Sequence, residues 1–246
     1  MRELSVDSKD YGSIFFVGDE IHKGKDLIVQ SNNSRLDPDY LFFFDSRGAG
    51  QSTTCSLSKM FVHYAEDTSY VLVCRPLHMT IWATLINFFK HNKLNPKIII
   101  TNMGFVDFTP KKKDLLLDSI KQVDYAIGYG NAKSHFTEQY QLSNGDKTDL
   151  HSVVYSDKYK AAIELLANQY KIVVLNTPPV ERKINIERDR PSSFFDGIEE
   201  ANNFNNAILG VDIVNPPLFD ETLTYDAVHY TDEGNKIIFN LLREHL

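Results

Sequence analysis

The sequence predicts a three-layer α/β/α domain with a parallel central sheet, and three features of the chain support this prediction. Five short runs are apolar almost throughout, which is typical of strands buried on both faces by helices. Segments with helical periodicity stand between these runs. The 246 residues contain no linker, repeat or low-complexity tract, so we expect one domain over residues 1–246.

The predicted strands end at turns where polar residues, glycine or proline follow directly. In a parallel sheet with right-handed crossovers, the functional crevice lies at the carboxyl ends of the strands. The side chains just after each strand are therefore the first candidates for a functional site. The five predicted strands are Ser13–Val17, Tyr40–Phe44, Tyr70–Cys74, Lys97–Thr101 and Lys171–Asn176.

Helices are predicted where a capping residue precedes a periodic apolar face. Thr231 is followed by Asp232 and Glu233, the acidic residues that a helix N-terminus favours. The other expected helices start after Ser52 or Thr53, after Thr109-Pro110, and within Ser156–Tyr170. Two polar stretches with weak periodicity, Asn131–Leu150 and Glu181–Asn206, are expected to be insertions or lids over the crevice.

Charge and composition exclude several classes of partner. The chain has 26 Lys and Arg against 33 Asp and Glu, which argues against a nucleic-acid or anionic membrane surface. No apolar run approaches the roughly 18 residues of a membrane span, and the first ten residues are polar. Cys55 and Cys74 cannot form a disulfide framework or a zinc finger, so we expect free thiols in a cytoplasmic protein.

The turns after the first two predicted strands hold candidate functional residues. Asp19 and Glu20 follow the first strand and either face the crevice or cap the next helix. After the second strand, Ser46 is followed by two glycines that permit tight backbone near a ligand, of which Gly50 is the second. Arg47 in the same turn could clamp a carboxylate or phosphate of a substrate, or form a surface salt bridge.

The third candidate group lies in the segment TYDAVHYTDEG near the C-terminus. Asp226 and His229 are three residues apart, just before a capped helix, and can place a carboxylate against an imidazole. Such a pair fixes the tautomer of the imidazole and stabilises the imidazolium in general-base catalysis. The alternative is a carboxylate and a histidine exposed in a loop without a shared role.

The order of these segments resembles that of the SGNH/GDSL hydrolases. The segments GDEIHKG, RGAGQSTT and DAVHYTDEG correspond to three blocks of that family, over nearly the whole chain, and the last is the most specific. The resemblance implies a flavodoxin-like parallel sheet with a strand order like 2-1-3-4-5. It also implies the activity of an esterase, lipase or acyltransferase.

The resemblance assigns roles to several residues. Asp19 belongs to the first block, Gly50 is the oxyanion-hole glycine of the second, and Asp226 and His229 form the last. Glu20 stands where the family has its nucleophilic serine.

A second departure concerns the segment GFVD at Gly104–Asp107, the best match to a further block of the family. Val106 stands where that block has its asparagine. Asp107 is kept as a candidate substrate-binding residue with Asp19, Gly50 and Arg47.

These departures leave three alternatives open. Removing the serine of a triad lowers turnover by about 10⁶-fold, and removing one oxyanion donor by roughly 10²–10³-fold, so ordinary serine chemistry at Glu20 is excluded. A relocated nucleophile is one alternative, with Ser46 the nearest by topology and Ser52 the next. A second is a cluster of three carboxylates and one imidazole, Glu20, Asp19, Asp226 and His229, that acts in acid–base chemistry or binds magnesium or manganese. The third is a catalytically silent protein that binds a sugar, an acyl ligand or a protein partner.

We therefore expect a divergent hydrolase or acyltransferase that acts on a small acyl ester or an acylated carbohydrate. His229 and Asp226 would transfer protons, and the N–H groups of Gly50 and Glu20 would form a partial oxyanion hole. The expectation includes no cofactor, no resident metal ion, and neither nucleic acid nor a membrane as partner. The silent binding protein remains the alternative.

Overall fold

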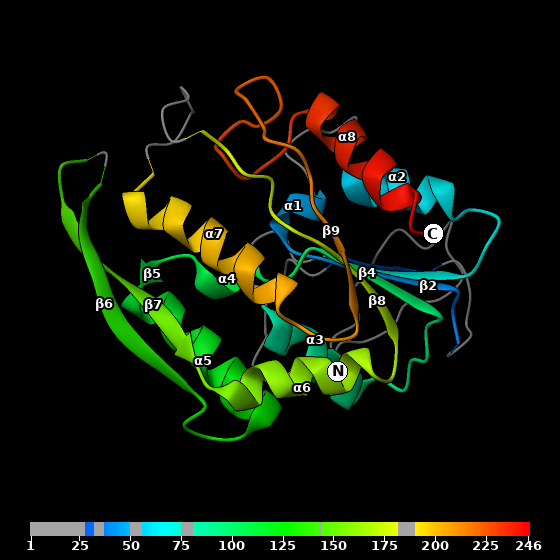
Figure 1. The fold of residues 1–246 in the computed structure, drawn as a ribbon, viewed down its shortest axis with the longest axis horizontal. Helices are drawn as coiled ribbons and strands as arrows, with labels where there is room; N and C mark the ends of the chain where they lie inside the picture. Colours follow the sequence, from blue (N-terminus) through cyan, green and yellow to red (C-terminus); the bar gives the residue numbers. More distant parts are fainter. Residues whose placement is uncertain (1–27, 32–36, 50–55, 75–80, 143, 182–189) are drawn as a thin grey trace.

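The computed structural model describes residues 28–31, 37–49, 56–74, 81–142, 144–181 and 190–246 of the 246-residue chain. A six-stranded sheet lies at its centre, with helices packed on both faces (Figure 1). The predicted three-layer α/β/α architecture is confirmed. The strands are β1 (Ile28–Ser31), β2 (Tyr40–Phe44), β3 (Tyr70–Cys74), β4 (Ile98–Thr101), β8 (Lys171–Leu175) and β9 (Val211–Val214).

The sheet has the order β1-β3-β2-β4-β8-β9, in which β1 is antiparallel to β3 and the other pairs are parallel. Counted from β2, the parallel strands follow the predicted order 2-1-3-4-5. The predicted assignment of strands to this order is wrong. It counts Tyr40–Phe44 as the second strand, which in the order 2-1-3-4-5 lies at the edge of the sheet, whereas this strand pairs with a neighbour on both sides. Ser13–Val17 lies outside the described residues, and the unpredicted Val211–Val214 completes the order. Ser46 therefore follows the first strand of the parallel order, the position that the prediction gives to Glu20.

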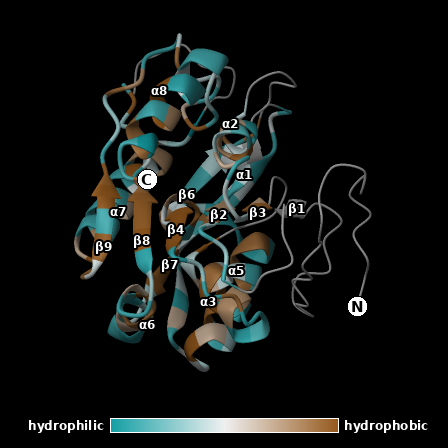
Figure 2. Cartoon of the chain, turned by 90° about the vertical axis from the view of Figure 1, so that its right-hand side faces the viewer, coloured by the Kyte–Doolittle hydropathy of each residue, from teal (hydrophilic) through white to brown (hydrophobic). Residues whose placement is uncertain are grey.

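Burial on both faces explains why the strands are continuously apolar. In β2, Leu41 and Phe43 face one layer, whereas Phe42 and Phe44 face the other, and all four are at most 1% exposed. Figure 2 shows β8 and β9 largely in the colours of hydrophobic residues. The helices are α1 (Ser46–Ala49), α2 (Leu57–Tyr64), α3 (Trp82–His91), α4 (Phe105–Phe108), α5 (Lys113–Ile127), α6 (Asp157–Ala167), α7 (Ser192–Asn206) and α8 (Asp232–Arg243).

The two layers have different helices. Side chains of α2 and α8 pack on one face of the sheet, and those of α3, α5, α6 and α7 pack on the other (Figure 1). Cys74, in the core of the first layer, is a buried free thiol. None of the helices in the described part of the chain has a stretch that is both long and apolar enough to cross a membrane.

Local capping sets where several helices begin. The hydroxyl of Thr231 accepts a hydrogen bond from the Gly234 N–H at 3.2 Å, as predicted for the start of α8. Helix α6 lies within the predicted range Ser156–Tyr170, and the side chain of Ser156, the residue before it, makes no capping hydrogen bond. The cap of α2 is Ser56, whereas Ser52 and Thr53 lie outside the described residues.

The helix predicted after Thr109-Pro110 begins later than expected. Thr109 ends the short helix α4, and α5 begins at Lys113. The intervening residues Lys111–Lys112 form strand β5.

The two stretches predicted to be insertions or lids have regular structure. Residues Ala132–Gln141 and Lys147–Tyr155 form the hairpin strands β6 and β7, which make a second, antiparallel sheet with β5 (Figure 1). Much of the second stretch is α7, which packs Phe194 and Ile198 into the core and is therefore part of a layer.

Candidate active site

The turn from β2 into α1 places Ser46 at the carboxyl end of the central sheet. Ser46 is partly exposed, whereas its neighbours Asp45 and Arg47 are buried. A Cβ added to Gly48 would lie 2.3 Å from the Cβ of Phe44, so the turn requires glycine at that position. The local sequence therefore presents Ser46 to solvent on a tightly held turn.

Arg47 holds this turn from the inside. Its guanidinium donates to the two carboxylate oxygens of Asp45 over distances of 2.9, 3.0 and 3.1 Å. It also donates to the main-chain oxygen of Asn102 and, at 2.7 Å, to Oγ1 of Thr177, and it lies 4.9 Å above the ring of Phe105. Burial alone would lower the pKa of Arg47, but the charge of Asp45 raises it above its ordinary value. The ion pair thus joins the ends of β2, β4 and β8.

These contacts correct the predicted role of Arg47. The side chain is neither at the surface nor directed to solvent, because the residue is only 1% exposed and its guanidinium is bonded to protein oxygens. Asn102 is held in the same network, since its amide donates to Asp45 Oδ1 and accepts from the Asp45 N–H, each at 2.9 Å. We assign both residues to positioning the turn that carries Ser46.

His229 lies between Ser46 and Asp226. Its Nε2 is 3.1 Å from Oγ of Ser46, although the two residues are 183 positions apart in the chain. Its Nδ1 is 3.1 Å from each carboxylate oxygen of Asp226. An ionised carboxylate can only accept, so in the neutral imidazole the proton is on Nδ1, and Nε2 accepts from the Ser46 hydroxyl. The three side chains form a continuous serine–histidine–aspartate arrangement.

The loop before α8 builds the aspartate–histidine pair locally. Oδ1 of Asp226 accepts from the N–H groups of Val228 at 3.2 Å and His229 at 2.9 Å. Ala227, between Asp226 and Val228, has a φ of 68°, in the left-handed region that few residues other than glycine adopt. The His229 carbonyl then accepts from the N–H of Tyr225 at 3.0 Å, which closes the loop.

Arg190 is a fourth member of the site that the sequence patterns do not predict. Its guanidinium donates to Oδ2 of Asp226 at 2.6 Å and to the main-chain oxygen of Asp226 at 3.2 Å, and it lies 4.5 Å above the Phe194 ring. Burial raises the pKa of Asp226, but the hydrogen bonds from His229 and the charge of Arg190 together hold it well below the ordinary 3.8. Asp226 is therefore ionised, with a partner on each side.

Asp107 is placed in the interior. It is fully buried, and its carboxylate accepts from the Trp82 N–H at 3.3 Å and from the Tyr159 hydroxyl. Burial raises its pKa above the ordinary value. The side chain joins the start of α3 to α6 and is not exposed to a ligand, contrary to the predicted role in substrate binding.

The remaining predicted site residues, Asp19, Glu20, Gly50 and Ser52, lie outside the described residues. Asp19 and Glu20 belong to the cluster of acidic residues and His229 that was one of the predicted alternatives for binding magnesium or manganese. Within the described ranges, no three His, Cys, Asp or Glu side chains are arranged to hold a metal ion.

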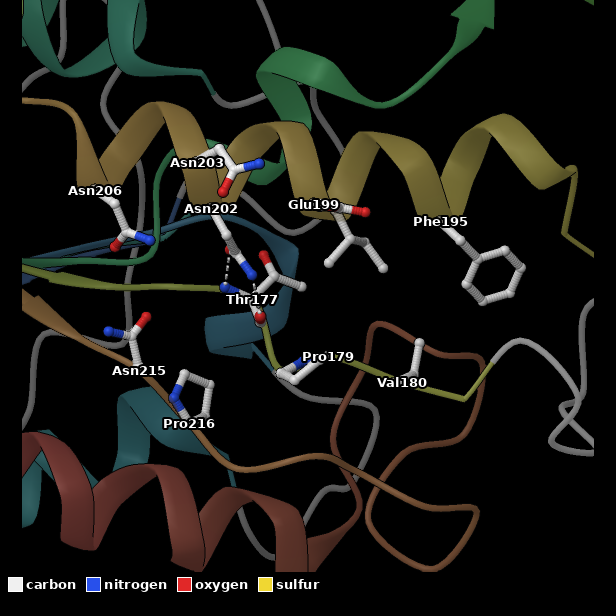
Figure 3. A pocket seen from close by; sticks show the side chains of 11 residues that line it. Thr177, Pro179, Val180, Phe195, Glu199, Asn202, Asn203, Asn206, Asn215 and Pro216 are labelled. Atoms are coloured by element: carbon white, nitrogen blue, oxygen red, sulfur yellow. Dashed lines mark hydrogen bonds between the residues drawn. The ribbon is translucent and has the colours of Figure 1, made fainter.

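The structure also contains a cavity of about 460 Å³, whose lining residues are drawn in Figure 3. It is bounded by α7 and by the segments that follow β8 and β9. Thr177, in its wall, accepts the hydrogen bond from Arg47, the neighbour of Ser46. The cavity is therefore at the same edge of the sheet as the serine–histidine–aspartate arrangement.

No protein-family model and no curated protein matches the sequence. Among solved structures, the chain is similar to an acetyl xylan esterase at 15% identity, with 84% of this chain and 98% of that chain covered and a TM-score of 0.42. It is also similar to a protein of Parabacteroides merdae provisionally named as a GDSL-like lipase, at 13% identity, 85% and 96% coverage and a TM-score of 0.43.

A further similar structure is an acetyl xylan esterase of the rumen bacterium Butyrivibrio proteoclasticus. The identity is 10%, the coverage is 84% of this chain and 63% of that chain, and the TM-score is 0.38. At such identities and scores, none of these similarities assigns an activity to this chain.

Proposed function

We propose that this chain is a serine-dependent hydrolase of carboxylic esters. Ser46 is the nucleophile, His229 is the general base, and Asp226 orients the imidazole. The observation that carries the proposal is the 3.1 Å contact between Ser46 Oγ and Nε2 of His229, whose other nitrogen faces Asp226. A nucleophile bonded to a base that a third group orients is the arrangement used in acyl transfer.

The first half of the reaction forms an acyl-enzyme. Oγ of Ser46 adds to the ester carbonyl carbon as its proton passes to Nε2 of His229, and the carbonyl oxygen becomes an oxyanion. The Asp226 carboxylate stabilises the imidazolium through Nδ1. When the intermediate collapses, the bond to the alcohol oxygen breaks, and His229 gives its proton to that oxygen. The alcohol leaves, and the acyl group remains on Ser46.

The second half repeats these steps with water. His229 takes a proton from the water as its oxygen adds to the acyl carbon. Collapse of this intermediate breaks the bond to Ser46, which regains a proton from His229. A carboxylic acid is released, and the enzyme returns to its starting state.

The N–H of Ser46 is the donor that we assign to the oxyanion. In the same turn, the N–H of Arg47 donates to Oδ1 of Asp45 at 2.9 Å and that of Gly48 donates to the Asp45 carbonyl at 3.0 Å. The amide of Asn102 is also bonded to Asp45. The N–H of Ser46 belongs to the residue whose Oγ attacks and takes no part in these bonds, so it can donate to the oxyanion that forms beside Oγ.

Among the alternatives that the sequence leaves open, the contact between Ser46 and His229 favours the relocated nucleophile. A protein that only binds a ligand needs no imidazole oriented toward a hydroxyl. Ser46 also follows the first strand of the 2-1-3-4-5 order, so no role for Glu20 as a replacement for serine is required.

Hydrolysis of 4-nitrophenyl acetate by single variants tests the proposal. We expect Ser46→Ala and His229→Ala each to lower kcat at least about 10³-fold, and the double variant to be no worse than the single ones, because the two side chains act as one unit. Ser134→Ala, at an exposed position in β6, should keep wild-type turnover. Wild-type turnover in Ser46→Ala would contradict the proposal.

A further inference from the structure

Two buried phenylalanine rings each support one of the two arginines of the candidate site. The Cζ atom of Arg47 lies 4.9 Å from the centre of the Phe105 ring, and that of Arg190 lies 4.5 Å from the centre of the Phe194 ring. A guanidinium over the face of a ring is attracted by the ring electrons, and its flat shape stacks on the flat ring. Each ring therefore limits where its arginine can lie.

The two rings also contact each other. The centres of the Phe105 and Phe194 rings are 5.5 Å apart, and their planes meet at 79°. This edge-to-face arrangement is one that aromatic pairs favour. A continuous series of contacts thus runs from Arg47 through the two rings to Arg190. One end of the series is the neighbour of the proposed nucleophile, and the other end binds Asp226.

Glycines bring the helices that carry these rings close together. Helices α4 and α7 lie side by side (Figure 1), and a Cβ added to Gly104, just before α4, would lie 2.6 Å from the side-chain amide of Asn205 on α7. A Cβ added to Gly197 on α7 would lie 2.9 Å from the carbonyl oxygen of Phe108 on α4. Phe108 also packs against Phe204 with ring centres 5.0 Å apart. The two helices are thus joined at several points, which fixes the two supporting rings relative to each other.

The turn that carries Phe194 is also held from the hairpin. Pro191 precedes α7, and its side chain provides no capping hydrogen bond. The N–H of Ser193 donates instead to Oε1 of Glu138 on β6 at 3.1 Å, and the Ser193 hydroxyl donates to the same oxygen. A carboxylate is favourable at a helix N-terminus, where the first N–H groups lack partners within the helix. Glu138 therefore holds the turn from which Phe194 supports Arg190.

We propose that Phe105 and Phe194 are positioning residues, with Glu138 holding the turn that carries the second of them. This inference rests on the proposed esterase function. The rings fix the two arginines with respect to each other, and so they fix Asp226 with respect to the turn that carries Ser46. They act through the arginines and not on the reacting atoms. A displacement of about 1 Å in a catalytic arrangement can lower turnover about 10²-fold, so even a partial loss of this support is measurable.

Leucine variants of the two rings test the proposal with 4-nitrophenyl acetate. Leucine keeps an apolar side chain but removes the flat face, so we expect Phe105→Leu and Phe194→Leu each to lower kcat about tenfold and to change KM less than about twofold. Phe88→Leu is the matched control, because Phe88 is buried and makes an edge-to-face contact of 5.5 Å with Phe89, but on α3. It should keep wild-type kcat. Thermal unfolding followed by circular dichroism shows which variants are folded, and wild-type kcat in either folded ring variant overturns the proposal.

A double variant shows whether Phe194 acts through Arg190. In Arg190→Gln protein the stacked contact is already lost, so adding Phe194→Leu should lower kcat by less than about twofold more. The same tenfold loss in both backgrounds would mean that the ring acts independently of the arginine. That result overturns the proposal.

Variants of Glu138 loosen the same turn without a change in the core, because Glu138 is only half-buried. Glu138→Ala should lower kcat about threefold or more, and Glu138→Gln, which keeps an acceptor oxygen, should recover most of the loss. Glu164→Ala is the matched control, since Glu164 also accepts from a main-chain N–H at 3.1 Å, that of Leu209, but on α6. If the ring variants do not fold, this comparison decides the proposal, and equal kcat in Glu138→Ala and Glu164→Ala overturns it.

Hydrogen exchange at Nε of Arg190 separates a failure of this inference from a failure of the proposed function. Nε donates to the main-chain oxygen of Asp226 at 3.2 Å, and its N–H resonance in protein labelled with ¹⁵N-arginine is assigned by its loss in Arg190→Gln. We expect exchange with water to be at least about fivefold faster in Phe194→Leu than in the wild type or Phe88→Leu, and no turnover is needed to measure it. Equal exchange overturns the inference even where the wild type hydrolyses esters. Faster exchange in a protein whose wild type hydrolyses no ester contradicts the proposed function and leaves the support of Arg190 by Phe194 standing.

Discussion

At the scale of single residues, the carboxylate of Asp226 is shared by two partners, the imidazole of His229 and the guanidinium of Arg190. His229 and Arg190 bind it from different sides, and the residue itself is fully buried. Removal of one partner of a buried ion pair is costly, because it leaves the other charge without compensation. Arg190 fixes the second oxygen, and so it fixes the plane of the carboxylate that the imidazole meets. We infer that Arg190 is a positioning residue for the proposed reaction.

Substitution of Arg190 tests this inference. Arg190→Gln should lower kcat about 10- to 100-fold with little change in KM, because the carboxylate is displaced while the substrate site is kept. Arg190→Lys keeps the charge without the planar fork and should recover part of the loss. Arg243→Gln is the matched control, since Arg243 also lies over a ring, that of Phe239, but far along α8. An unchanged kcat in Arg190→Gln, measured with 4-nitrophenyl acetate, would contradict the role.

The lowered pKa of Asp226 makes the stability of the fold depend on pH. Its folded-state value lies below the ordinary 3.8, so the ionised form stabilises the fold above that pH and the contribution is lost as the pH falls below it. We expect the free energy of unfolding to fall more steeply between about pH 5 and pH 3 in the wild type than in Asp226→Asn. Urea unfolding at several pH values measures the two slopes. Equal slopes would show that Asp226 is not held ionised in the folded state.

At the scale of elements, α7 is joined to the sheet by amides as well as by apolar packing. Asn205 is buried on α7 and bonds Trp82 on α3, Asn176 after β8, and the carbonyl of Met103 at 3.0 Å. Asn202, one turn earlier, exchanges two hydrogen bonds of 2.9 Å with the main chain of Thr177. These contacts set the distance between α7 and the strand ends, and so the width of the cavity.

Asn205→Ala is expected to destabilise the fold by about 2–4 kcal/mol, because it leaves the indole N–H and a buried carbonyl without partners. Asn203→Ala, on an exposed part of the same helix, should change the free energy of unfolding by less than about 0.5 kcal/mol. Trp82 is the single tryptophan of the chain, so its fluorescence reports both urea transitions. Equal stability of the two variants would contradict the anchoring role of Asn205.

At the scale of the whole molecule, the sequence predicts the layers better than the site. Four of the predicted strands are found within one residue of their expected bounds, because burial on both faces leaves an unbroken apolar run. Val211–Val214 is missed because it is a short edge strand that contains Asp212. The hairpin of β6 and β7 is missed because most of β6 is exposed and carries polar side chains.

The site could be predicted only where its residues are close in sequence. Asp226 and His229 are three apart, and their pattern points to a shared role. Ser46 could be named as a candidate from its place after a strand, but its contact with His229 depends on the topology of the sheet. Arg190 lies 36 residues from Asp226, in a charged stretch with no pattern, so only the folded chain reveals the pair.

The proposed reaction requires that Ser46 is the group that His229 activates. The most direct measurement is labelling of the folded protein with a fluorophosphonate, followed by digestion and mass spectrometry of the peptides. The hydroxyl of an activated serine displaces fluoride from phosphorus, so we expect the adduct on Ser46 in the wild type and little or none in His229→Ala. An adduct on a different serine, or equal labelling of Ser46 in His229→Ala, would contradict the account.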